Sequence, residues 1–266
     1  MPAVLLAALL LTAGSSPARA DAADAEPIDR QPYKIELHLV ADPTARIDER
    51  LRRQTILRFT DLAHRFVGPA WSMSVAAPPS PLVGEGLARL DSEALSAFDP
   101  SLDKVWLVWV AAAPEGGGLL LKGREYDVAT RWLGPLQVHP APSLRDLPRA
   151  LFTLARNLFS PSALIGGEEG GRALLKVRGS ALTPASGLGT VVEKGTTFIP
   201  IRLISMRDET VRITRIAFTY LVAESIEGST ARCAIVSAFR DPLTRRMSRP
   251  NTLAALGIKP GDVPLH

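Results

Sequence analysis

The stretch Lys104–Ala112, KVWLVWVAA, decides how the first half of the chain folds. After the opening lysine every residue is apolar, so neither face of an extended strand would be polar. Strands without a polar face are typical of the middle of a sheet that is covered on both sides. The stretch therefore predicts a central strand with other strands beside it.

Further extended segments flank this strand in the sequence. YKIELHLV, from Tyr33, alternates apolar and polar residues, and AWSMSVAA at 70–77 predicts a second strand. LLLKGREY and WLGPLQV, together spanning 119–138, predict a hairpin closed by Asp127, whose carboxylate can accept backbone N–H bonds two or three residues on. The YD..T pattern of this turn occurs once, so it indicates one hairpin and not a repeating β-propeller.

Three helices are expected around these strands. The first runs near Pro43–Val67 behind a capping Asp42, and a short one runs through Asp91–Phe98. The third begins near Asp146, because Pro148 is tolerated only in the first turn of a helix. The order strand, helix, strand, short helix, three strands, helix predicts a mixed sheet covered by helices.

From the glycine-flanked Glu168-Glu169 onward, β-branched and aromatic runs separated by short turns replace the helical pattern. They predict a small antiparallel β-barrel or sandwich, so the fold class is α+β: a mixed sheet with two main helices, followed by the β unit. The expected divisions are an α/β domain at 33–165, an all-β domain at 166–250, and a C-terminal tail or truncated strand at 251–266.

The N-terminus predicts export. A short apolar run leads to Ala18-Arg19-Ala20, an A-x-A cleavage signal, so residues 1–20 are expected to be a signal peptide removed after Ala20, and residues 21–32 a polar leader. The protein is then periplasmic or extracellular, and no later segment is apolar for long enough to span a membrane. Cys233 is the only cysteine, which excludes an intramolecular disulfide and favours a buried thiol.

Charge and motifs narrow the functional classes. The formal net charge is +4, but acidic residues are interspersed throughout, so nucleic acid is not an expected partner. The sequence contains no G-x-S-x-G, no H-E-x-x-H and no G-x-x-x-x-G-K-[ST]. We therefore expect no metal site, no cofactor and no enzymatic activity of a recognisable motif class.

Glu36 and His38 are the best candidates for catalysis. At i, i+2 on one strand their side chains project from the same face, about 7 Å apart. If that face lined a cleft, the carboxylate could orient the imidazole for acid–base work. The alternative is a polar outer face of the sheet with no chemical role.

Two groups of arginines are candidate binding residues for an acidic protein partner or for an anionic envelope surface. The first group is expected on the first helix and consists of Arg46, Arg50 and Arg53. The second group follows the last clear β segment and consists of Arg240, Arg245, Arg246 and Arg249. The alternative for the first group is a solvated helix face balanced by Asp48 and Glu49, and for the second a solvated loop without aromatic residues for base stacking.

The run RITRIAFTYLVAES (212–225), followed by IVSAFRDPLTRR (235–246), resembles a pattern in uncharacterised exported bacterial proteins. The resemblance extends over about Tyr33–Arg246, more weakly in the first half. It implies the order leader, α/β domain, β domain, and it implies no activity. The element order of the first domain also resembles the N-terminal domain of TolB-like periplasmic proteins, as an analogy of fold without a shared site motif.

Taken together, these features predict an exported, non-enzymatic envelope protein that acts as a binding or scaffolding factor. One alternative is a hydrolase-like enzyme without a local motif, with Glu36 and His38 as its first candidate residues. Another is a secreted lipid- or glycan-binding module. A glycan binder would need an exposed aromatic platform, for which the four tryptophans are candidates, whereas core packing is their default role.

Overall fold

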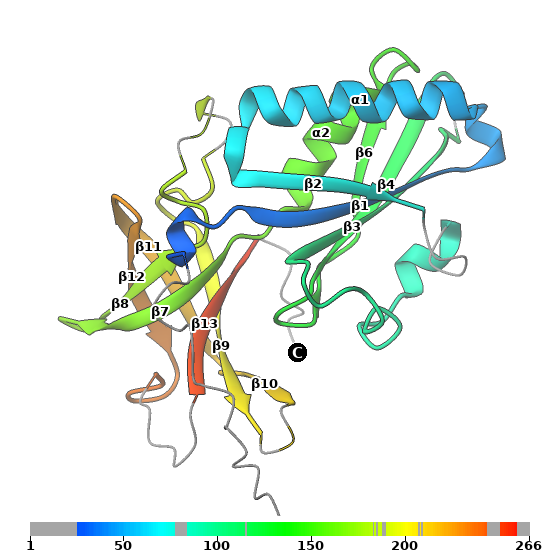
Figure 1. The fold of residues 1–266 in the computed structure, drawn as a ribbon. Coiled ribbons are helices and arrows are strands. Elements are labelled where there is room, and N and C mark those ends of the chain that lie inside the picture. The colour runs from blue at the N-terminus through cyan, green and yellow to red at the C-terminus, as the bar shows by residue number, and fades with distance from the viewer. Residues whose placement is uncertain are drawn as a thin grey trace, which may run out of the picture.

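The computed structural model describes residues 26–77, 84–114, 116–182, 184, 186–187, 190–206, 208, 210–243 and 251–259. They form a six-stranded mixed sheet with two α-helices on one face, here called sheet A, followed by a seven-stranded antiparallel β unit (Figure 1). The predicted α+β fold class is thus confirmed. The predicted signal peptide and residues 21–25 of the leader lie outside the described residues.

The central strand of sheet A is β3 (Lys104–Ala112), as its apolar sequence predicts. On one side it pairs in parallel with β1 (Tyr33–Ala41), which pairs in parallel with the edge strand β2 (Trp71–Ala76). On the other side it pairs antiparallel with β4 (Leu119–Asp127). The return of the hairpin is divided into β5 (Trp132–Leu133) and β6 (Gln137–Ala141), which both pair with β4.

Helices α1 (Glu49–Phe66) and α2 (Leu147–Leu158) lie on the same face of sheet A (Figure 1). Their buried residues share one apolar core with the inward side chains of β1, β3 and β4. Gly123 of β4 allows α2 to approach the sheet closely, because a Cβ atom there would lie 2.9 Å from Leu158 Cδ1. The start of α2, with Pro148 in its first turn, agrees with the prediction.

The predicted long helix from Pro43 is wrong at its N-terminal end. Asp42 caps only the 3₁₀ turn Pro43–Ala45, after which Arg46 adopts a left-handed conformation at φ 53°. The helix begins six residues later, where Asp48 Oδ1 accepts a hydrogen bond of 2.7 Å from the amide of Leu51. Two aspartates capable of capping lie close together in the sequence, and the left-handed residue between them separates two elements.

The other face of sheet A is covered mainly by irregular structure. The 3₁₀ segment Gly84–Arg89 and the turns that follow it pack Leu87 and Leu95 against β3 and β4. The helix predicted over Asp91–Phe98 is wrong, since this segment consists of turns and bends. Asp91 does cap locally: its Oδ1 accepts a hydrogen bond of 2.9 Å from the amide of Ala94.

The β unit contains seven strands, of which six close into a barrel. They run in the order β9-β11-β12-β8-β7-β13, and β13 returns to β9. The barrel form is therefore the correct one of the two predicted alternatives, and the remaining strand, β10, pairs with β9 outside the closed ring. The strands are β7 (Ser162–Glu169), β8 (Arg172–Val177), β9 (Thr197–Ser205), β10 (Val211–Arg215), β11 (Thr219–Glu227), β12 (Thr230–Ser237) and β13 (Asn251–Ile258).

The barrel takes in residues from both sides of the expected 166–250 domain. Its first strand begins at Ser162, and Asn251–Ile258, expected as a tail or truncated strand, is the closing strand β13. Leu253 and Ala255 of β13 point into the barrel core. Leader residues near the 3₁₀ turn Ile28–Arg30 also lie against the barrel, where the carbonyl of Ile28 accepts a 3.0 Å bond from the amide of Gly179.

Candidate functional site

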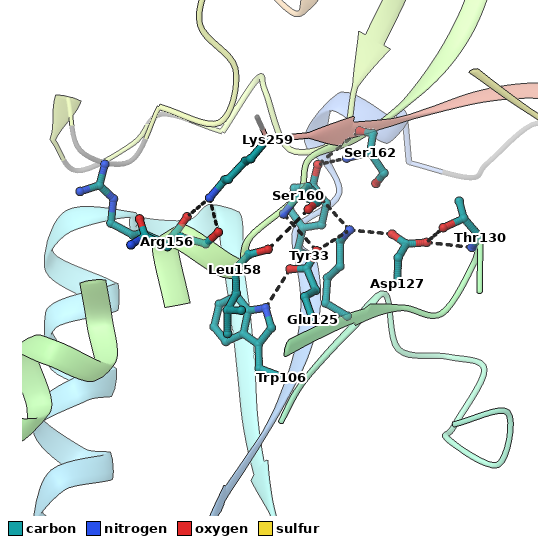
Figure 2. Close-up of polar contacts among 12 residues, drawn as sticks. Tyr33, Trp106, Glu125, Asp127, Thr130, Arg156, Leu158, Ser160, Ser162 and Lys259 are labelled. Atoms are coloured by element: carbon teal, nitrogen blue, oxygen red, sulfur yellow. Dashed lines mark hydrogen bonds and ion pairs between the residues drawn. The ribbon is translucent and has the colours of Figure 1, made fainter. Parts of the chain in front are cut away.

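Among the residues that the structure describes, the most heavily charged buried cluster surrounds Lys104 at the start of β3 (Figure 2). Its side chain is fully buried, and Nζ lies 2.6 Å from Asp127 Oδ2 and 3.4 Å from Glu125 Oε1. Nζ also donates a 2.6 Å hydrogen bond to the carbonyl of Ser160. The antiparallel register of β3 and β4 places these groups on one face, since Lys104 pairs with Asp127 and Trp106 with Glu125.

The two carboxylates are satisfied by further protein donors (Figure 2). Glu125 accepts from the indole Nε1 of Trp106 at 2.8 Å and from the amide of Ser160 at 3.0 Å. Asp127 accepts from the amide of Thr130 at 2.7 Å and from its hydroxyl at 2.6 Å. The predicted turn-closing role of Asp127 is confirmed, and the lysine adds a second role.

Burial and charge act against each other in this cluster. Burial alone would lower the pKa of Lys104, but Asp127 and Glu125 outweigh it, and the pKa is raised. Burial raises the pKa of Glu125, although Lys104 opposes the shift. Burial also raises the pKa of the Tyr33 hydroxyl to about 12. The ammonium group donates hydrogen bonds to Asp127 and to the carbonyl of Ser160 and forms an ion pair with Glu125, so groups of the protein itself engage it.

The cluster joins sheet A to the barrel. Ser160 belongs to the short connection between α2 and β7, and the Tyr33 hydroxyl accepts a 3.0 Å hydrogen bond from the amide of Ser162, the first residue of β7. Beyond β13, Lys259 donates to the carbonyls of Arg156, at 2.7 Å, and Asn157 at the C-terminal end of α2 (Figure 2). The geometry supports a role in holding the two parts of the fold together.

Sequence reasoning missed this cluster apart from Asp127. The available signal was a lysine opening an otherwise apolar strand, and two acidic residues at i, i+2 closing the strand after it. A hairpin of these two strands brings their start and end together, so opposite charges meet. To recognise that Lys104 faces Glu125 and Asp127, one needs the register of the two strands, which the sequence pattern alone leaves open.

The structure brings Glu36 and His38 together. His38 Nε2 lies 2.7 Å from Glu36 Oε1, and Nδ1 lies 3.1 Å from the carbonyl of Ala77. Only 3% of His38 is exposed, and its ring lies 5.3 Å from that of Phe98, so the alternative of a polar outer face is wrong for this residue. Both ring nitrogens face hydrogen-bond acceptors of the protein, which leaves neither free to meet a substrate.

The predicted arginine groups are only partly described. Arg46 lies before α1 in the left-handed turn, so the first group does not form one helical stripe; Arg50 and Arg53 are exposed on α1. Arg240 is exposed in the loop after β12. The three other arginines of the second group lie outside the described residues: Arg245, Arg246 and Arg249.

The tryptophans are engaged within the protein. Trp71 and Trp106 pack edge to face with ring centroids 4.9 Å apart in the core of sheet A. Trp109 carries Lys122 over its ring at 5.1 Å, and Trp132 packs on the outside of the barrel with the Arg215 guanidinium 3.9 Å from its centroid. Trp132 therefore contributes to the contact between the two parts of the fold.

Two surface features were missed by sequence reasoning. On the barrel, Phe218 is 71% exposed and Phe239 is 56% exposed, and their rings lie 6.1 Å apart. On sheet A, a groove of about 230 Å³ lies between α1 and the start of α2, with Arg58 and Arg145 among its lining residues. Neither feature has a local sequence signature, because each joins residues from separate elements.

No protein-family model matches the chain, and no curated protein matches it significantly. Among solved structures, the chain is similar to TolB from Acinetobacter baumannii, with 12% identity and a TM-score of 0.30 over 76% of this chain. The match spans 57% of the length of that protein. A similarity of this size does not establish a shared fold, so the resemblance to TolB-like domains stays a prediction. Within the described residues, no helix is long and apolar enough to cross a membrane.

Proposed function

We propose that this chain is an exported envelope protein that acts by binding another envelope protein, as a non-enzymatic scaffolding factor. The observation that carries the proposal is the exposed aromatic pair Phe218 and Phe239 on the barrel. Exposed aromatic side chains in contact with each other are typical of binding surfaces, where their burial contributes much of the affinity.

The pair belongs to a small apolar surface at one end of β11 and β12, here called the aromatic platform. Phe218 immediately precedes β11, Phe239 follows β12 by two residues, and Val236 near the end of β12 is 54% exposed. A hydrogen bond of 3.1 Å from the amide of Ala238 to the carbonyl of Phe218 ties the two segments together. The platform is thus built on strands whose positions the barrel determines.

The backbone at Phe218 supports a role beyond folding. Its φ is 51°, in the left-handed region that bulky residues rarely adopt, at a cost on the order of 1–2 kcal/mol. A glycine or asparagine would relieve this strain, and the exposed ring contributes little to the core. Strained positions that bring no folding benefit are enriched at functional sites.

The buried polar groups support the same proposal. The ammonium group of Lys104 and both ring nitrogens of His38 have protein partners. These groups therefore stabilise the described fold, whereas the aromatic platform is open to solvent.

Export with cleavage after Ala20 is part of the proposal and rests on the sequence of the leader. N-terminal sequencing of secreted material should begin at Asp21, and an intact Met1 would contradict export.

The decisive experiment is cross-linking and affinity capture with tagged chain 21–266 from the envelope fraction of its own host, at low and high salt. We expect a specific protein partner to survive high salt, because burial of apolar surface is not screened by ions. The variant Phe218→Ser/Phe239→Ser should weaken the purified partner's binding by about 30-fold or more, as expected for the loss of interface hot spots.

The matched control is Val138→Ser/Ile226→Ser, which removes two exposed apolar side chains from other parts of the surface. It should capture the partner as the parent does. Retention of the partner by the phenylalanine variant, or the absence of any salt-resistant protein partner, would overturn the proposal. Far-UV circular dichroism of both variants verifies that the fold is retained.

A further inference from the structure

A second surface of the molecule has the properties of a binding groove. It lies between α1 and the start of α2, on the helical layer of sheet A and away from the strands that carry the aromatic platform (Figure 1). It holds about 230 Å³. The groove is lined by Leu51, Gln54, Thr55, Arg58, Leu144, Arg145 and Pro148.

The helical layer around this groove is strongly basic. The sequences of α1 and α2 together contain seven arginines and only two acidic residues, Glu49 and Asp61. No carboxylate lines the groove, and within the described part of the chain no salt bridge involves Arg58 or Arg145. Their two guanidinium groups are therefore available to a ligand that carries negative charge.

The groove also presents apolar surface. Leu51 and Pro148 form part of its lining, and Leu144 is 41% exposed there. Leu57 of α1 is 71% exposed as well, but it is not one of the residues that line the groove.

We infer that this groove binds an acidic segment of a partner protein that inserts one apolar side chain between the helices. The two arginines would pair with carboxylates of the segment, and Leu51, Leu144 and Pro148 would surround its apolar side chain. The groove is smaller than the roughly 300–1,000 Å³ of sites for drug-sized ligands, and so suits a side chain better than a cofactor. This inference is independent of the aromatic platform, because its ligand and its surface are different.

Three observations favour an acidic peptide over other anions. The lining contains no aromatic residue on which a nucleic-acid base could stack. The groove combines two arginines with apolar side chains in a hollow of about 230 Å³, whereas a helix bound at a lipid surface buries one whole apolar face in the membrane. The groove residues Leu51, Gln54 and Arg58 follow one face of α1, so a short helical or extended segment could lie along this face.

The test uses a fluorescent twelve-residue peptide with six glutamates and three leucines, titrated into chain 21–266 and followed by anisotropy. Binding should weaken about three- to fivefold for each groove arginine removed, so the variant Arg58→Gln/Arg145→Gln should bind roughly 10- to 25-fold more weakly. The matched control, Arg65→Gln/Arg156→Gln, removes the same charge from exposed positions of the same helices and should change binding less than twofold.

Two further probes separate charge from apolar anchoring. A peptide with serine in place of leucine should bind several-fold more weakly, because the groove floor loses its contact. Vesicles of phosphatidylglycerol and phosphatidylcholine test the lipid alternative by sedimentation. Equal weakening by the groove and control variants, no binding of the acidic peptide, or binding of vesicles without binding of the peptide would each overturn the inference. The Phe218→Ser/Phe239→Ser variant should bind the peptide normally, whatever the result of the capture experiment.

Discussion

Replacing Lys104 by methionine tests the view that the buried charge cluster holds the fold together. Methionine retains most of the volume of the lysine side chain, so the change removes the charge without opening a large cavity. It leaves Glu125 and Asp127 buried without their shared cation, and it deprives the carbonyl of Ser160 of its 2.6 Å donor.

The expected cost is about 4 kcal/mol of unfolding free energy. Removal of one partner of a buried ion pair costs roughly 3–5 kcal/mol, because the remaining charge is left uncompensated. A hydrogen bond to a charged donor is worth about 1.5–3 kcal/mol, but this contribution overlaps with the first and is not added to it. Since domains are stable by about 5–15 kcal/mol, the variant should fold but be markedly weakened.

Urea unfolding followed by far-UV circular dichroism measures this cost, with the m-value as a check that the unfolded state is unchanged. The matched control is Lys34→Met, the same substitution at an exposed position of β1, which should change stability by no more than about 0.5 kcal/mol. The triple variant Lys104→Met/Glu125→Gln/Asp127→Asn should recover about half of the loss, because it leaves no buried charge unpaired. A loss below about 1 kcal/mol for Lys104→Met would refute the reasoning.

Two further predictions test the barrel. Burial raises the pKa of the Cys233 thiol to about 12. At about pH 8.5 the native protein should therefore react with a thiol reagent at least a thousandfold more slowly than the protein unfolded in urea. Rapid labelling of the native protein would contradict a buried thiol. Gly257→Ala would place a Cβ atom 2.7 Å from the ring of Pro161, so it should lower stability by about 1–3 kcal/mol in the same urea assay. An unchanged midpoint would mean that β13 does not pack against Pro161 as described.

Local sequence patterns predicted the elements whose signal lies within a few residues. The apolar run of β3, the alternation of β1 and the turn closed by Asp127 are examples, because side-chain periodicity and hydrogen bonds to nearby amides decide them. The start of α1 was missed because Asp42 and Asp48 are both good caps. The left-handed backbone of Arg46 between them has no sequence signature.

Strand pairing between distant parts of the chain explains the other differences between the predicted and the observed structure. The sequence of β13, NTLAALGI, is rich in alanine and leucine, which favour helices as much as strands, and its partners β7 and β9 are far away in the sequence. The candidate pair Glu36 and His38 was found from its spacing, but its burial depends on the covering segment that contains Phe98. The aromatic platform likewise joins the ends of two strands.

The sequence by itself determined the alternation of element types and the buried position of its single cysteine, because these depend on composition and on periods of two to four residues. The tertiary structure decided which charges meet and which apolar side chains stay exposed. Lys104 meets Asp127 only through the register of β3 and β4, and Arg58 and Arg145 line one groove only through the packing of α1 beside α2. Such contacts depend on the relative placement of whole elements, which a local pattern does not encode.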